Sequence, residues 1–298
     1  ALLKGQDSDS VGAKAFAAKV GQNLTTVAGT SIQKTGYYEI TGLAPGYYLV
    51  KDKADTITGH DAYTRFILQV VGNVEVNPKR DFPAVEKKVQ DDDVDGWNDS
   101  ADYDIGDSVP YKLTGTLPLN VVDYQNYYYQ FTDELTAGLT YNDDAKVYIV
   151  NGEVKIDVTD QVGVVYHGST LTVESSDIKK LEGVTVTAES KVVVEYTATL
   201  NDQAAIGEAG NPNTVNLTYS NDPNYTGGNA PVGETPKDKV TVFTYKLVVN
   251  KVDENKVALE GAGFTLYKIV NEVETKVGEQ LATGSIFTWK GLDAGQYV

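Results

Sequence analysis

The stretch Val74-Glu75-Val76-Asn77-Pro78-Lys79-Arg80-Asp81-Phe82-Pro83-Ala84-Val85-Glu86-Lys87-Lys88-Val89 decides how the chain is divided, because it ends one predicted domain and begins the next. It holds two lysines in opposite settings. Lys79 follows a proline in a polar break between strands, so its amine is expected in water, within reach of another protein. Lys87 shares one face of a predicted strand with Val85 and Val89, because side chains alternate between faces. We therefore expect Lys87 to be buried, where a lone ammonium either loses its proton or finds a partner.

Length and composition limit the class of protein. The chain has 298 residues, which is too long for one sandwich domain and fits two or three. Tyr outnumbers Phe by 20 to 7 and Met is absent, a composition typical of strands rather than helices. A net charge of −17 disfavours nucleic acid and anionic membranes as partners. A secreted protein without cysteine has no disulfides, so another kind of cross-link is worth seeking.

Working outward from this stretch, the turn and strand signals divide the chain into three domains: 1–79, 80–243 and 244–298. The first begins with one helical pattern, Ser10–Leu24, and continues as short strands, the last of them Val74–Val76. The sequence opens without a signal peptide, has no apolar run that could span a bilayer, and stops in a predicted strand. We therefore expect a piece of a longer protein, incomplete in its first and third domains.

The middle segment has the turn spacing of an antiparallel sandwich. Its expected strands are Val109–Leu113, Tyr127–Phe131, Lys146–Val150, Thr170–Val173, Ser190–Leu200 and Asn213–Tyr219. The third segment opens with a strand in which Leu247, Val249 and Lys251 share a face. The predicted fold is all-β: tandem immunoglobulin-like β-sandwich domains, with a short helix in the N-terminal domain.

Alternation also places Asp133 on the same face as Phe131 and Leu135, and Asn213 at the start of an inward-facing apolar series. A lysine, an aspartate and an asparagine then point into one core. Burial favours the neutral, nucleophilic amine and the neutral acid. Asp133 could hydrogen-bond to the Asn213 carboxamide oxygen and move protons while Lys87 Nζ attacks the carbon and ammonia leaves. The alternative is a buried Lys–Asp ion pair that is hydrogen-bonded to an asparagine, without a covalent bond.

Four stretches resemble those of the backbone (major) pilins of Gram-positive bacteria, which are sortase-assembled fimbrial shafts of Cna A-type and Cna B-type immunoglobulin-like domains. Residues 74–79 resemble the pilin motif, usually Val-Tyr-Pro-Lys, with Asn77 in place of Tyr. Residues 83–87 resemble the start of a pilin middle domain. Residues 131–139 and 213–223 resemble its segments with the catalytic acid and the acceptor asparagine.

The resemblance implies a role for each of these residues. Lys79 would accept the carboxyl end of the next identical subunit from a pilus-specific sortase. Lys87 and Asn213 would form an isopeptide bond in a Cna A-type middle domain, with Asp133 as its catalytic acid. Lys251 resembles the donor lysine of a Cna B-type third domain. The first domain has Lys51 where a bond-forming domain would carry a catalytic Glu, so no cross-link is expected there.

The resemblance also implies a setting. The protein would be an extracellular, cell-wall-anchored fimbrial subunit that meets identical subunits, minor pilins and host surface ligands. It would not be a turnover enzyme and would require no cofactor. The family's carboxyl-terminal sorting signal, Leu-Pro-x-Thr-Gly, is absent from this sequence, as truncation at Val298 would explain.

An acidic loop follows the Lys87 strand and is the one candidate metal site. Its spacing is similar to that of a calcium loop, in which carboxylates and a glycine-permitted turn wrap one cation. A solvated acidic loop is the alternative, since the last ligand is Asp rather than Glu and no helices flank it. The candidate Ca²⁺ ligands are Asp91, Asp93, Asp95, Asp99 and Asp102, with the turn at Gly96.

Other functions have weaker support. His60 and His167 are the only histidines and lie in different predicted domains, which disfavours Ser-His-Asp and zinc sites. A modular adhesin for a host or matrix ligand is the main alternative to a shaft subunit, although no long insertion is present. A carbohydrate-binding module would need exposed aromatic side chains, for which the run Tyr127-Tyr128-Tyr129 is the candidate.

Overall fold

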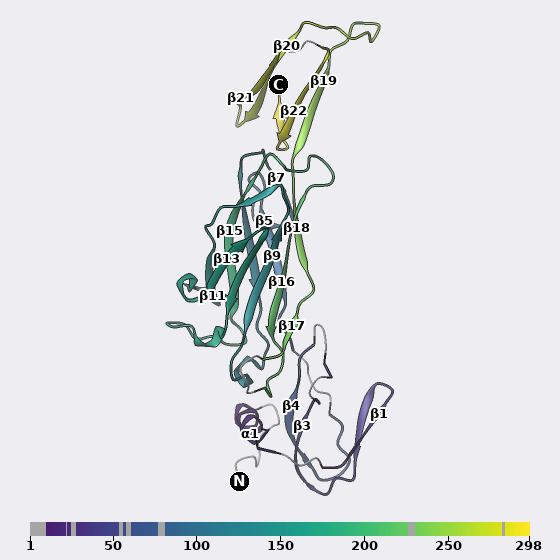
Figure 1. Cartoon of the computed structure of the whole chain (residues 1–298), viewed down its shortest axis with the longest axis vertical. Helices are drawn as coiled ribbons and strands as arrows, with labels where there is room; N and C mark the ends of the chain where they lie inside the picture. Colours follow the sequence, from purple (N-terminus) through teal and green to yellow (C-terminus); the bar gives the residue numbers. More distant parts are fainter. Residues whose placement is uncertain are drawn as a thin grey trace.

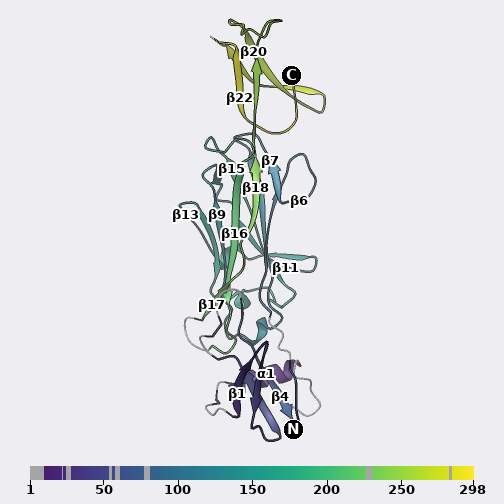
Figure 2. The same cartoon turned by 90° about the vertical axis from the view of Figure 1, so that its right-hand side faces the viewer.

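The computed structural model describes residues 10–21, 23–24, 28–53, 56–57, 61–76, 81–225, 230–281 and 284–298. In two perpendicular views the chain is elongated, with three groups of strands following one another along the long axis (Figures 1 and 2). The amino-terminal group lies at one end, the largest in the middle and the carboxyl-terminal group at the other end. This confirms the predicted all-β class. No helix within the described ranges is long and apolar enough to cross a membrane.

The amino-terminal group combines one helix with two antiparallel strand pairs. Helix α1 (Val11–Gly21) lies within the segment predicted to be helical, and it packs against β3 and β4. The pairs are β1 (Thr30–Lys34) with β2 (Tyr37–Thr41), and β3 (Gly46–Lys51) with β4 (Arg65–Val70). Residues 73–76 are irregular, so the prediction of a strand at Val74–Val76 was wrong. Without a partner strand, the alternation of valines does not by itself form one.

The middle group contains two facing sheets, each of seven strands within the described residues. One sheet has the order β12-β11-β15-β8-β5-β6, with β10 also paired to β15. The other has the order β13-β14-β9-β16-β18-β7, with β17 also paired to β16. Every pairing is antiparallel except that between β18 and β7.

The bounds of these strands are β5 (Val85–Gln90), β6 (Trp97–Asn98), β7 (Ser100–Asp102), β8 (Ser108–Gly115), β9 (Tyr129–Leu135), β10 (Leu139–Tyr141), β11 (Lys146–Asn151), β12 (Val154–Asp157), β13 (Gly163–His167), β14 (Thr170–Ser175), β15 (Lys191–Leu200), β16 (Asn211–Ser220), β17 (Val232–Glu234) and β18 (Asp238–Phe243). Three short 3₁₀ turns join them: η1 (Val121–Asp123), η2 (Thr159–Gln161) and η3 (Ile178–Lys180). All six strands that the sequence predicts in this segment are present.

The core of the middle group lies between the two sheets because each strand alternates buried and exposed residues. In β8 the buried residues are Val109, Tyr111, Leu113 and Gly115, each separated by a less buried one. Tyrosine fills much of this core, and Tyr111, Tyr127, Tyr129 and Tyr219 are among its largest fully buried side chains. Burial of large aromatic rings is a main source of the stability of such a sandwich.

The third group has a smaller core. Strand β19 (Tyr245–Asn250) pairs with β22 (Ile286–Leu292), while β20 (Gly263–Val270) pairs with β21 (Val273–Leu281) and β23 (Gln296–Tyr297). The buried residues between them are Leu266, Phe287, Trp289 and Leu292. Leu247 and Val249 face this core, as their alternation predicted.

Specific polar contacts join neighbouring groups. At the amino-terminal junction, Tyr63 donates a backbone hydrogen bond to Asn221 (2.7 Å), and the Arg65 guanidinium donates to the Asp123 carbonyl (2.8 Å). At the other junction, the Ile105 backbone N–H donates to the Gly291 carbonyl (2.9 Å). These contacts support the end-to-end arrangement.

Candidate functional site

Lys87 lies at the centre of β5 and its side chain is fully buried. Strand β5 pairs with β8, so that Lys87 is opposite Leu113 and points toward the second sheet. Its backbone N–H donates to Asp238 Oδ2 of β18 (2.7 Å), which holds this edge of the first sheet against the second. The prediction that Lys87 is buried is confirmed.

Asp133 and Asn213 come from adjacent strands of the second sheet. Strand β9 pairs with β16, which sets Asp133 opposite Val215, and Asn213 opposite Leu135. Both polar side chains are fully buried and face the first sheet, as alternation predicted. The fold thus brings Lys87, from one sheet, to two polar residues of the other.

The charged groups make short contacts. Lys87 Nζ lies 2.6 Å from each carboxylate oxygen of Asp133. Asn213 is not bonded directly to Asp133. Instead, its Nδ2 donates to the hydroxyl of Tyr196 (2.7 Å), and its Oδ1 has no hydrogen-bond partner among the described residues. The expected hydrogen bond from Asp133 to the carboxamide oxygen is therefore replaced by a bridge through Tyr196.

Tyr196 is a further member of the cluster, one that the sequence patterns did not single out. It lies in β15 of the first sheet, opposite Tyr111 of β8, and is buried. Its hydroxyl accepts from Lys87 Nζ (3.0 Å) and Asn213 Nδ2, and donates to Asp133 Oδ2 (2.5 Å). Strand alternation could have found it, because Val194 and Ala198 on either side are also buried.

Aromatic rings exclude water from the cluster. Tyr111 stacks on Tyr196 with ring centres 5.2 Å apart, and Tyr141 approaches Tyr196 edge-on at 5.8 Å. Lys87 Nζ lies 5.1 Å from the ring centre of Tyr111 and 5.3 Å from that of Tyr196. The ring faces offer the ammonium some cation–π attraction but no proton acceptor, so Asp133 and the Tyr196 hydroxyl are its hydrogen-bond partners.

Burial sets the protonation behaviour of the cluster. It lowers the pKa of Lys87 to about 8, although the Asp133 carboxylate opposes this shift. Burial also raises the pKa of Tyr196 well above its ordinary value, and the nearby Asp133 adds to the increase. At neutral pH the phenol therefore keeps its proton, while the amine loses its own more readily than a surface lysine does.

The other predicted lysines are placed differently. Lys79 and the neighbouring Asn77 lie outside the described residues. Lys251 directly follows β19 and is partly exposed, and its backbone N–H donates to the Ser285 carbonyl (2.8 Å). Lys51 ends β3 and is exposed. A cross-link through Lys251 stays a prediction, as does the absence of one at Lys51.

The acidic loop does not converge as a calcium loop would. Asp91 uses Oδ1 to accept the backbone N–H groups of Asp93 and Val94, and Oδ2 to accept that of Asp102. The Asp99 carboxylate lies 2.6 Å from Lys88 Nζ. Asp95 is exposed. The Asp102 carboxylate accepts the Ala294 backbone N–H (2.7 Å). Three of the five candidate ligands therefore already have partners within the protein, and calcium binding stays a prediction.

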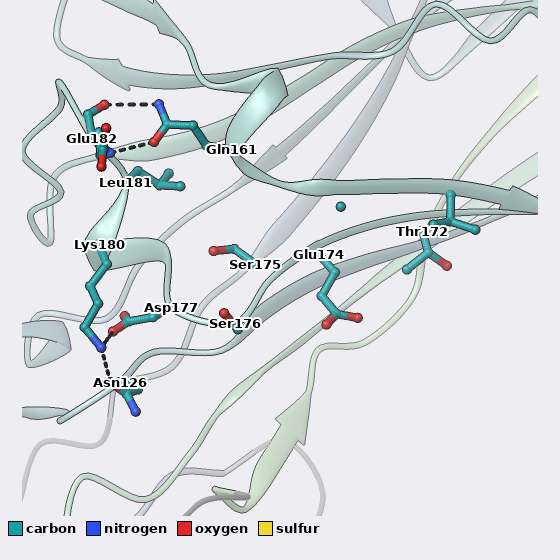
Figure 3. Close-up of a pocket in the computed structure, with 12 residues that line it drawn as sticks. Asn126, Gln161, Thr172, Glu174, Ser175, Ser176, Asp177, Lys180, Leu181 and Glu182 are labelled. Carbon is teal, nitrogen blue, oxygen red and sulfur yellow. Dashed lines mark hydrogen bonds and ion pairs between the residues drawn. The ribbon is translucent and has the colours of Figure 1, made fainter.

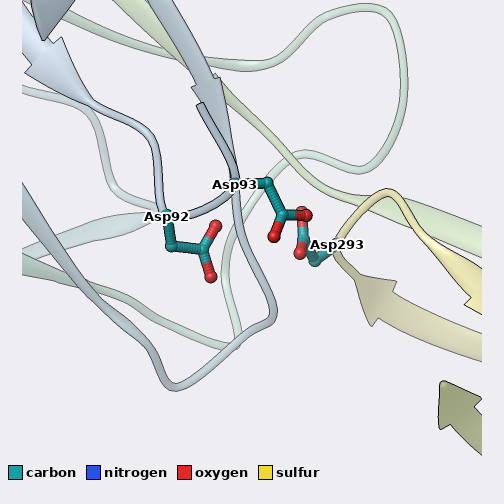
Figure 4. Close-up of side chains that lie close together, drawn as sticks. All are labelled: Asp92, Asp93 and Asp293. Atoms are coloured by element: carbon teal, nitrogen blue, oxygen red, sulfur yellow. The ribbon is translucent and has the colours of Figure 1, made fainter. Parts of the chain in front are cut away.

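A different set of carboxylates converges at the junction with the third group. Asp92, Asp93 and Asp293 each place an oxygen within 4.8 Å of the others (Figure 4). Asp293 also lies 2.7 Å from Lys268 Nζ, which bonds Asp104 as well (3.2 Å). This cluster joins residues about two hundred positions apart, which sequence spacing could not reveal.

An open groove of about 870 Å³ lies beside β13 and β14 of the middle group. Polar side chains line it, and several bond one another: Lys180 with Asp177 (3.0 Å), and Gln161 with the Glu182 backbone (Figure 3). Among the described residues that line it none is aromatic, and Tyr127 and Tyr129 of the candidate tyrosine run are buried in the core. The groove gives no specific support to a carbohydrate-binding module.

The fold and the buried cluster together define the class: a rod of β-sandwiches whose largest member joins its two sheets through a buried Lys–Asp–Tyr–Asn network. Residues 105–223, in the middle group, match the family described as Gram-positive pilin backbone subunit 2, Cna-B-like domain. The sequence motifs instead predict a Cna A-type domain at residues 80–243, and that assignment stays a prediction.

Similarity to known proteins extends beyond the family match. The trypsin-resistant surface T6 protein of Streptococcus pyogenes serotype M6 is 29% identical in an alignment over 212 residues, and the match covers 65% of this chain and 38% of that protein. This chain therefore spans well under half the length of that relative.

Solved structures support the same assignment of the fold. The T6 backbone pilin of S. pyogenes serotype M6, a modular three-domain structure, has a TM-score of 0.63 and 19% identity, covering 96% of this chain and 65% of that one. The major pilin SpaD of Corynebacterium diphtheriae has a TM-score of 0.55 and 21% identity, covering 84% and 63%. The predicted resemblance to Gram-positive backbone pilins is thus confirmed.

Proposed function

We propose that this chain is part of a structural backbone subunit of a covalently polymerised pilus on a Gram-positive cell wall. The buried Lys87–Asp133–Asn213 cluster is the observation that carries the proposal, because it places an amine, an acid and a carboxamide in one dry core. The similarity to backbone pilins supports it. The protein would be extracellular and would have a structural role rather than that of a turnover enzyme.

The first part of the proposal is an internal cross-link. Lys87 Nζ attacks the Asn213 carboxamide carbon, a C–N bond forms, and the bond to Nδ2 breaks with release of ammonia. Asp133, bonded to Lys87 at 2.6 Å, takes up and returns protons during the step. The bond would connect β5 to β16 across the two sheets, so that pulling on the chain ends could not separate them.

Intact mass tests this part directly. The cross-link predicts a mass one ammonia below that of the sequence, together with a branched tryptic peptide that joins Lys87 to Asn213. Asp133→Ala should have the full mass of its sequence, because the cross-link does not form. Lys88→Ala, at the neighbouring outward-facing lysine, should still lose one ammonia. A full mass in the unchanged protein would mean that the cluster is an ion pair only.

The second part is covalent assembly. Lys79 would receive the carboxyl end of the next identical subunit from a sortase, and minor pilins would join the same polymer. This assignment rests on the motif at residues 74–79, since Lys79 lies outside the described residues.

Assembly is tested in the full-length protein, expressed with its sortase. Lys79→Ala should abolish the ladder of covalent polymers on a denaturing gel, while Lys51→Ala, at an exposed lysine of β3, should leave it intact. A ladder that persists in Lys79→Ala would assign the acceptor to another lysine.

A surface adhesin for a host or matrix ligand is the alternative function. The polar groove beside β13 and β14 is the feature that could hold such a ligand, though its side chains largely satisfy one another (Figure 3). Screening this chain on glycan and matrix-protein arrays separates the two functions: a shaft subunit predicts no saturable binding. Binding that is lost on Lys180→Ala would favour the adhesin.

A further inference from the structure

We propose that Tyr196 is a catalytic residue of the cross-linking reaction, in which its hydroxyl carries a proton from Asp133 to the departing nitrogen of Asn213. The inference rests on the proposed cross-link and assigns a residue to a step that the lysine, the aspartate and the asparagine do not complete by themselves. Tyr196 is the group that contacts all three of these side chains.

The geometry carries the argument. The departing atom is Nδ2 of Asn213, which must gain a proton to leave as ammonia. Asp133 makes no hydrogen bond to Nδ2, whereas the Tyr196 oxygen lies 2.7 Å from it. The same oxygen lies 2.5 Å from Asp133 Oδ2. A proton can therefore pass from acid to leaving group through one hydroxyl, after a rotation about its C–O bond.

The step balances in atoms and charge. Lys87 first transfers one ammonium proton to the Asp133 carboxylate, and the neutral Nζ attacks the carboxamide carbon. Asp133 then passes its proton to the Tyr196 oxygen while the Tyr196 proton moves to Nδ2, and the regenerated carboxylate takes a proton from Nζ. The C–Nδ2 bond breaks and ammonia leaves. The products are the amide, a protonated Asp133 and an unchanged Tyr196.

The surroundings suit a relay rather than an exchange with water. Tyr196 is buried, and its ring is held by Tyr111 and Tyr141. The Asp238 carboxylate accepts the Lys87 backbone N–H and is a further charge that acts on the Lys87 amine. Because burial raises the pKa of Tyr196, the hydroxyl stays protonated and can donate at neutral pH.

The test compares Tyr196→Phe with Tyr129→Phe. Each change removes one buried hydroxyl from the same core, but the Tyr129 hydroxyl donates to the Thr116 carbonyl (2.9 Å), outside the cluster. The protein is made by cell-free synthesis, samples are denatured at timed intervals, and their intact masses are measured by mass spectrometry. The loss of ammonia over time gives the rate of cross-linking. General acid–base groups commonly contribute roughly 10²–10⁴-fold, so we expect Tyr196→Phe to be at least about tenfold slower and Tyr129→Phe to keep the normal rate.

The pH profile separates catalysis from structure. In the unchanged protein the protons move within the buried network, so the rate should vary little between pH 6 and 7, below the lowered pKa of Lys87 at about 8. In Tyr196→Phe the leaving nitrogen must take a proton that originates in solvent, so its rate should fall as the pH rises. A merely structural role would lower the rate by the same factor at every pH.

A folding control and the wild-type mass keep the outcomes distinct. Thermal unfolding of Asn213→Ala, with and without Tyr196→Phe, shows whether the phenylalanine protein folds. If the unchanged protein never loses ammonia, the cross-link itself is wrong. If it does, and a folded Tyr196→Phe protein reacts at the normal rate with the same pH profile, only the role of Tyr196 is overturned.

Discussion

Removing the acceptor asparagine should cost the middle sandwich much of its stability. In Asn213→Ala the buried Lys87–Asp133 pair remains, since its 2.6 Å contacts do not involve the asparagine. The lost cross-link would have closed a loop of more than a hundred residues, for which chain entropy gives about 5 kcal/mol. One hydrogen bond to Tyr196 is also lost, at about 1 kcal/mol. At roughly 2–4 °C per kcal/mol for a domain of this size, a loss of about 6 kcal/mol should lower the Tm by roughly 12–24 °C.

The matched control is Asn211→Ala, two residues earlier in β16. Asn211 is also buried, and its side chain bonds the Ala205 backbone and the Val242 carbonyl. Its loss should cost roughly 1–3 kcal/mol and leave the cross-link in place. Calorimetry on both variants, each with its intact mass, makes the comparison. Equal losses of Tm in the two variants, with the unchanged protein cross-linked, would refute the loop-closure reasoning.

Three further predictions concern pH and packing. In Asn213→Ala, Lys87 has a pKa of about 8 in the folded protein and its ordinary value of 10.5 in the unfolded chain, so between these values the unfolded chain binds more protons. The free energy of unfolding should therefore rise from pH 8 to pH 10.5. Adding Lys87→Met to Asn213→Ala should remove this rise. At the junction, burial and Asp102 raise the pKa of Asp293 to about 7 from 3.8, so docking of the third group should weaken as the pH rises through that range. Asp102→Asn should make this pH dependence smaller. The measurement is amide hydrogen exchange of Ile105, whose N–H donates to Gly291 across the junction, corrected for the intrinsic pH dependence of exchange. A Cβ at Gly115 would lie 2.1 Å from the Tyr129 hydroxyl and 2.9 Å from the Phe131 ring. Gly115→Ala should therefore lower the free energy of unfolding, measured with denaturant, by about 1–3 kcal/mol. An unchanged free energy of unfolding would contradict the packing described.

Alternation along single strands determined much of the site in advance. It placed Lys87, Asp133 and Asn213 on inward faces, and all three are buried. This works because the side-chain period of a strand is a local property that tertiary packing rarely reverses. Turn residues likewise located the strands of the middle group, whereas the valines at residues 74–76 show that alternation without a pairing partner is not sufficient.

Only the tertiary structure decided which inward residues meet. Tyr196 enters the cluster because β15 lies in the sheet of β5 and faces β9 and β16, a pairing that no local pattern in the sequence encodes. The acidic residues show the same limit: spacing suggested one loop, but Asp93 converges with Asp92 and with Asp293 from the third group. Sequence period fixes the face on which a side chain lies, while its partners depend on strand order and sheet packing, which are set by contacts between distant parts of the chain.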